Sequence, residues 1–173
     1  MNLHSPGRIL FVSSACLCLA LAFALHVGAQ PAGPRQEEKT VSLHAAGTFE
    51  VKLTPQPADP AVAGAEISRF LLEKQFHGGL EATSQGQMLA FGGAQKGSGG
   101  YVAIERVTGT LDGRTGSFAL QHSGRMQPGA TQLSIAVIPG SGTGQLAGLA
   151  GSMNIVIEAG KHSYTFDFTL PGA

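Results

Sequence analysis

The chain has 173 residues, with 11 basic and 11 acidic side chains and a formal net charge of zero. This length fits one domain and is short for two. Nucleic-acid binding requires a concentrated basic surface, and the neutral composition argues against it. Charged residues make up only 13% of the chain, and 25 residues are glycine. Low charge and many glycines favour an all-β domain with many turns.

The first 29 residues predict a signal peptide. Arg8 precedes an apolar run from Ile9 to Leu25, and small residues occupy Val27 and Ala29, the two positions that signal peptidase reads. We therefore expect cleavage after Ala29 and export to the periplasm of a bacterium or out of the cell. The alternative is a retained membrane anchor, because residues 9–29 are long enough to span a bilayer.

The mature chain would contain no cysteine, because Cys16 and Cys18 both lie in the expected signal peptide. No disulfide or cysteine metal site is then expected, and the histidines show no metal-ligand spacing, so no cofactor is predicted. The polar, Pro-rich residues 30–42 predict a flexible linker. Residues 43–173 form the predicted domain, which is not expected to contact a membrane after cleavage.

The predicted domain is a series of short alternating apolar runs separated by glycines. Apolar residues at every second position predict strands with one face in a core. The eight expected strands are residues 48–53, 67–76, 80–90, 101–111, 117–123, 132–138, 153–157 and 162–170. Turn signals between neighbours favour a single antiparallel β-barrel of about eight strands, arranged as a meander. A sandwich is the alternative, since periodicity alone does not separate the two folds.

Two details of these strands carry expectations of their own. Gly86 interrupts the run 80–90 and suggests a β-bulge. Arg69, Glu73 and Lys74 blur the alternation of the run 67–76. We expect Arg69 and Lys74 to be solvated, or to keep their charged ends in water above an apolar stem.

The clearest local signal is a β-hairpin between Gly99 and Gly124. Two alternating runs flank the polar turn residues 112–115, which contain Asp-Gly. A loop with an even number of residues places Glu105 and His122 on the same, otherwise apolar face. With a four-residue loop, these two side chains would lie directly opposite each other.

The Glu105–His122 pair is the best chemical clue in the sequence. Burial raises the pKa of a carboxyl group and a nearby imidazolium lowers it, so such a pair can move a proton on a bound molecule. The alternative is a hydrogen-bonded pair that only fixes the register of the hairpin. A metal site formed by Glu105, His122 and His162 has no local spacing to support it.

Three motifs carry a resemblance to a known family. They are GYVAIER at residues 100–106, GSFALQH at 116–122 and IPGSGTG at 138–144. In this order they resemble domain-of-unknown-function family 3224, over roughly residues 47–170. The resemblance implies a barrel like that of allene oxide cyclases, in the neighbourhood of the calycins, and it implies no established activity.

We therefore expect an exported barrel that binds a small apolar ligand. The residues expected to contact that ligand are Tyr101, Phe118, His162, Tyr164 and Phe166. One alternative is a cofactor-free isomerase or cyclase, with Glu105 as proton shuttle and His122 as its partner. Another is a structural or interaction module with a solid core. Low charge on the outer strand faces favours a homo-oligomer. A pocket of about 300 Å³ or more with a few convergent polar groups would favour ligand binding, whereas a solid core would favour the structural or interaction module.

Overall fold

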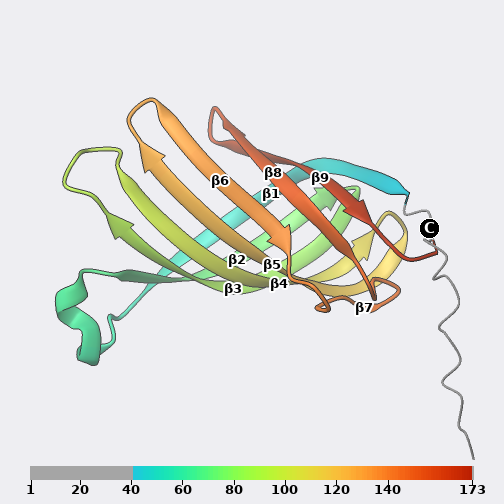
Figure 1. The fold of residues 1–173 in the computed structure, drawn as a ribbon, viewed down its shortest axis with the longest axis horizontal. Helices are drawn as coiled ribbons and strands as arrows, with labels where there is room; N and C mark the ends of the chain where they lie inside the picture. Colours follow the sequence, from blue (N-terminus) through green and yellow to red (C-terminus); the bar gives the residue numbers. More distant parts are fainter. Residues whose placement is uncertain (1–40, 173) are drawn as a thin grey trace, which may run out of the picture. The chain divides into compact units, whose positions relative to one another are not determined.

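The computed structural model describes residues 41–172, and every strand in this range belongs to one antiparallel sheet (Figure 1). The strands are β1 (Ser42–Gln56), β2 (Ser68–Gly78), β3 (Leu80–Gly92), β4 (Gly99–Leu111), β5 (Arg114–Gln127), β6 (Ala130–Val137), β7 (Thr143–Gly144), β8 (Ala150–Glu158) and β9 (Lys161–Thr169). A short 3-10 helix, η1 (Pro60–Ala65), connects β1 to β2. The expected signal peptide, residues 1–29, and residues 30–40 of the expected linker lie outside the described residues.

The sheet closes on itself. Its strands follow the order β1, β2, β3, β4, β5, β6, β8, β9, and β9 pairs with β1 to complete the circle. The short strand β7 pairs with the start of β5 as an addition to the eight. The predicted all-β antiparallel barrel of about eight strands is therefore confirmed. The ladders differ in length, and the one between β6 and β8 consists of a single residue pair, Ala136 with Ser152.

The β4–β5 hairpin has a different register from the one predicted. Leu111 pairs with Arg114, so the loop contains two residues, Asp112 and Gly113, both with positive φ (47° and 79°). This is the backbone that a type I′ turn requires, and it suits the twist of the strands. Because both loop lengths are even, the predicted inner face is retained, but Glu105 now pairs with Leu120.

The predicted bulge at Gly86 is also wrong. Gly86 pairs with Leu72 on one side and with Glu105 on the other, and both ladders continue without a break. A Cβ atom at Gly86 would lie 2.7 Å from both Cα and Cβ of Glu105. The glycine is therefore required by the close approach of β3 to β4 at Glu105.

One end of the barrel is filled by apolar side chains. Phe118 of β5 and Phe166 of β9 stack there with ring centroids 5.8 Å apart. Leu146 and Leu149, from the connection between β7 and β8, are buried in the same cluster. This connection runs beside the β4–β5 turn, where Gln145 N donates a hydrogen bond to Thr115 O. The packed core therefore occupies the barrel end that contains the β4–β5 turn and β7, two elements whose backbones can be found in Figure 1.

No helix within residues 41–172 has the length and hydropathy needed to cross a membrane.

Candidate functional site

A pocket of about 300 Å³ opens at the other end of the barrel, where hairpins join β3 to β4, β5 to β6 and β8 to β9. Its apolar lining comes from residues of six strands: Phe49, Val51, Leu53, Leu72, Met88, Ala103, Leu133, Ile155 and Ile157. Ile157 is 63% exposed and Leu53 45% exposed, so both lie at the mouth. The volume is at the lower end of the range for small-molecule sites.

Polar groups form a stripe on one wall of the barrel, across four consecutive strands. Glu105 of β4 is at the centre and is fully buried. Its Oε1 atom accepts hydrogen bonds from Lys74 Nζ of β2 at 2.7 Å and from His122 Nε2 of β5 at 2.8 Å. Its Oε2 atom accepts one from Ser84 Oγ of β3 at 2.5 Å. Lys74 and His122 also line the pocket, so they connect the buried carboxylate to the cavity.

Glu105 is held in its ionised form by these contacts. Burial alone would raise its pKa, but the hydrogen bond from His122 and the positive charge of Lys74 outweigh burial and lower the pKa from 4.5 to about 2. A carboxylate with three donors and such a low pKa is a weak base. Glu105 is therefore better suited to anchoring Lys74 and His122 than to accepting a proton from a bound molecule.

The low pKa of Glu105 predicts a loss of stability in acid. Folding lowers this pKa from 4.5 to about 2, so the ionised carboxylate stabilises the native state by about 3 kcal/mol. That contribution is complete above pH 4.5 and is lost as the pH falls toward 2. We expect urea midpoints to fall more steeply in the wild type than in Glu105→Gln as the pH falls from 4.5 toward about 2. Parallel curves for the two proteins would contradict the assignment.

The residues predicted to contact a ligand fall into two groups. Tyr101 and His162 line the pocket, together with His122. Phe118 and Phe166 lie outside it, at the filled end of the barrel, and each is no more than 1% exposed. The sequence places all of them on inner faces, but it does not show at which height along the barrel the core ends and the pocket begins.

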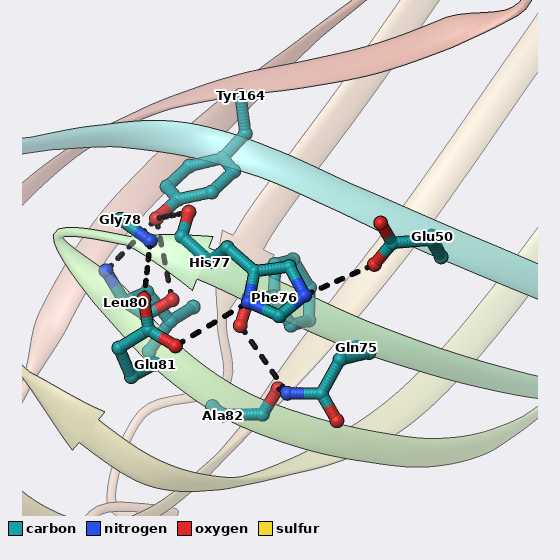
Figure 2. Close-up of polar contacts among 9 residues, drawn as sticks. All are labelled: Glu50, Gln75, Phe76, His77, Gly78, Leu80, Glu81, Ala82 and Tyr164. Carbon is teal, nitrogen blue, oxygen red and sulfur yellow. Dashed lines mark hydrogen bonds and ion pairs between the residues drawn. The ribbon is translucent and has the colours of Figure 1, made fainter.

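Tyr164 also lies outside the pocket, although it is buried. Figure 2 shows its phenol directed toward the turn between β2 and β3. The hydroxyl accepts a hydrogen bond from Leu80 N at 2.8 Å and donates one to His77 O at 3.3 Å. Tyr164 therefore fixes this turn to β9. On the adjoining surface His77 lies between Glu50 and Glu81, with nitrogen–oxygen distances of 3.2 and 3.5 Å (Figure 2).

Lys74 is the site residue that sequence reasoning missed. It is only 8% exposed, so the expectation that it is solvated is wrong. Its phase in β2 contains the signal, because Leu72, Lys74 and Phe76 occupy alternate positions and all face inward. Glu105 provides the partner that makes burial of the ammonium tolerable.

Within residues 41–172, no group of three or more histidine, cysteine, aspartate or glutamate side chains could hold a metal ion.

Comparisons with known proteins identify the family of this chain. Residues 45–168 match the family described as "Protein of unknown function (DUF3224)". The chain is also similar to the crystal structure of a DUF3224 protein of unknown function from Shewanella oneidensis MR-1. That alignment has 48% sequence identity and a TM-score of 0.70, and it covers 78% of this chain and 100% of the other. No curated protein matches the chain. The chain belongs to the DUF3224 family.

Proposed function

We propose that this protein binds a small, largely apolar molecule in the open end of its barrel. The observation that carries the proposal is the pocket of about 300 Å³, in which Lys74, Tyr101, His122 and His162 join an otherwise apolar lining. Ligand sites typically combine such a lining with a few polar groups that orient the bound molecule. Leu53 and Ile157 leave apolar surface exposed at the mouth, and a ligand would cover it.

The arrangement of the walls supports an oriented ligand. Lys74 and His122 belong to β2 and β5, on the wall that holds the buried Glu105. The lining residues of β8, Ile155 and Ile157, are apolar. A molecule with one polar end and an apolar body would satisfy both walls, because unpaired polar groups are costly in an apolar site.

Adjacent residues of β8 provide a matched test. Ile157 lines the pocket, whereas Val156 is on the outer face, and both are at least half exposed. We expect the fluorescence of the neutral dye N-phenylnaphthylamine to rise on addition of the wild-type protein. Ile157→Asp should weaken dye binding about tenfold or more, because it places a charge against the apolar body of the dye. Val156→Asp should leave binding unchanged.

The same test can overturn the proposal. A folded wild-type protein that does not bind the dye would contradict a ligand site, as would equal losses in Ile157→Asp and Val156→Asp. Either result would favour the structural or interaction module. The isomerase alternative gains little support from the site, because Glu105 is ionised and has three hydrogen-bond donors.

We further propose that the protein acts after export, on the basis of the apolar run from Ile9 to Leu25 and the small residues before Gln30. Mass spectrometry of protein recovered from a bacterial envelope would test this proposal and identify co-purified small molecules. The expected chain begins at Gln30, and a mass that includes residues 1–29 would contradict cleavage.

A further inference from the structure

The inner end of the pocket contains a hydrogen-bond donor that the protein only partly satisfies. Lys74 has three N–H donors and no acceptor. Among the described residues its one hydrogen-bond acceptor is Glu105 Oε1, at 2.7 Å. The rings of Phe49 and Phe76 lie 5.1 and 5.5 Å from Nζ and contribute cation–π contacts. An oxygen acceptor of a bound molecule would pair with a second of the three N–H donors.

A second donor faces the same cavity. The hydroxyl of Tyr101 makes no hydrogen bond to any described residue, and Tyr101 lines the pocket. Burial, and then the negative charge of Glu105, raise the pKa of this phenol above 10. It therefore stays protonated and able to donate. Lys74 and Tyr101 come from β2 and β4, so residues with donor groups on two strands line one cavity.

Among the described residues, the one carboxylate in contact with the lining residue Lys74 is already occupied. Glu105 is fully buried, and its two oxygens already accept hydrogen bonds from Lys74, His122 and Ser84. A ligand hydroxyl could accept from Lys74, but its own hydrogen would find no carboxylate. A carbonyl group has only acceptor capacity, so it fits the donors without leaving a hydrogen unpaired.

Charge favours a neutral ligand. The positive charge of Lys74 is balanced by Glu105, because the two groups form an ion pair at 2.7 Å. A carboxylate ligand would add a negative charge close to Glu105, in a cavity with apolar walls, where desolvation is costly. An amine ligand would meet the like charge of Lys74. A neutral oxygen acceptor avoids both penalties.

We propose that the ligand is a neutral apolar molecule with a carbonyl oxygen, as in a ketone, aldehyde or ester, and that this oxygen accepts a hydrogen bond from Lys74. The apolar part of the molecule lies against Leu53, Ile155 and Ile157. The inference rests on the proposed function, because it identifies the chemical class of ligand for the same pocket.

Displacement of N-phenylnaphthylamine by a series of probes of equal chain length tests the inference. The series contains a medium-chain methyl ketone, the matching terminal alkene, the primary alcohol and the carboxylate. The ketone should bind about tenfold or more tightly than the alkene, because only the ketone can accept a hydrogen bond from the charged donor Lys74. It should also bind more tightly than the alcohol and the carboxylate. In infrared spectra, its carbonyl stretch should shift to lower wavenumber on binding.

Two lysine variants localise the effect. Lys74→Met should reduce ketone binding about tenfold or more and abolish the infrared shift, while binding of the alkene is unchanged. Lys52→Met is the matched control, because Lys52 is an exposed lysine in an ion pair with Glu73, and it should change neither probe. If Lys74→Met alone does not fold, the double variant Lys74→Met/Glu105→Gln removes both charges and keeps an acceptor for His122 and Ser84.

Failure of the inference and failure of the proposed function give different results. If the dye does not bind, the ligand site itself is overturned. If the dye binds but ketone and alkene displace it equally, the site stands and the carbonyl inference is wrong. Tighter binding of the alcohol or the carboxylate than of the ketone, or an unchanged ketone affinity in the lysine-74 variants, would also overturn it.

Discussion

Phe118→Ala is expected to lower the free energy of unfolding by about 3–5 kcal/mol, the usual cost of deleting a fully buried phenylalanine ring. Phe118 is 1% exposed and stacks on Phe166 at the filled end of the barrel. The substitution leaves a cavity in a packed cluster, and the surrounding strands can collapse into it only in part. Because small domains are stable by about 5–15 kcal/mol, the change should be plain in urea denaturation curves.

The control for Phe118→Ala is a large apolar residue on the outer face of the neighbouring strand. Ile104 of β4 is 58% exposed, so Ile104→Ala should change the free energy of unfolding by no more than about 0.5 kcal/mol. Equal losses in the two variants would contradict the assignment of inner and outer faces. Both variants keep the β4–β5 turn intact, so the comparison isolates side-chain burial.

Glu105→Leu is expected to lower the free energy of unfolding by about 3–5 kcal/mol, because it leaves the ammonium of Lys74 buried without its partner. His122 and Ser84 lose the same acceptor. Adding Lys74→Met removes the unpaired charge, and replacement of a whole buried ion pair by apolar residues is often nearly neutral. The double variant Lys74→Met/Glu105→Leu should therefore be more stable than Glu105→Leu alone in thermal and urea unfolding.

An exposed ion pair between β1 and β2 provides a control for the buried pair, which joins β2 to β4. Lys52 and Glu73 lie 3.4 Å apart with side chains that are 74% and 45% exposed. A double-mutant cycle with Lys52→Met and Glu73→Leu should show a coupling of at most about 1 kcal/mol. The cycle with Lys74 and Glu105 should show more than that. Similar couplings would mean that the buried cluster is not held together by its charges.

The sequence predicted the faces of the strands well because burial imposes a period of two residues. In β4 and β5 this period placed Glu105, Phe118 and His122 on the inner face, where they are buried. The alternation survives a change of loop length from four residues to two, so the face was predictable although the exact partner of Glu105 was not. The length of the loop depends on single backbone angles, such as the positive φ of Asp112, and these are much harder to predict from the sequence.

The contents of the barrel were less predictable, because position along its axis depends on how all the strands are staggered. Alternation gives the same inward direction to Phe166 at the filled end and to His162 at the pocket. Lys74 was missed for a related reason. Lysines are rarely buried in proteins. Burial of Lys74 of β2 depends on its ion pair with Glu105 of β4, and Glu105 is in turn hydrogen-bonded to Ser84 of β3. The sequence does not show such a three-strand contact.

The single-pair ladder between β6 and β8 gives this closed barrel a latent edge. Strand edges are templates for pairing with other chains, and full closure normally removes them. Separation of Ala136 from Ser152 would convert the barrel into an open sheet with β6 and β8 as its terminal strands. We therefore expect strand exchange or aggregation under mildly denaturing conditions to begin at this seam, which has fewer paired residues to break than any other in the eight-stranded circle.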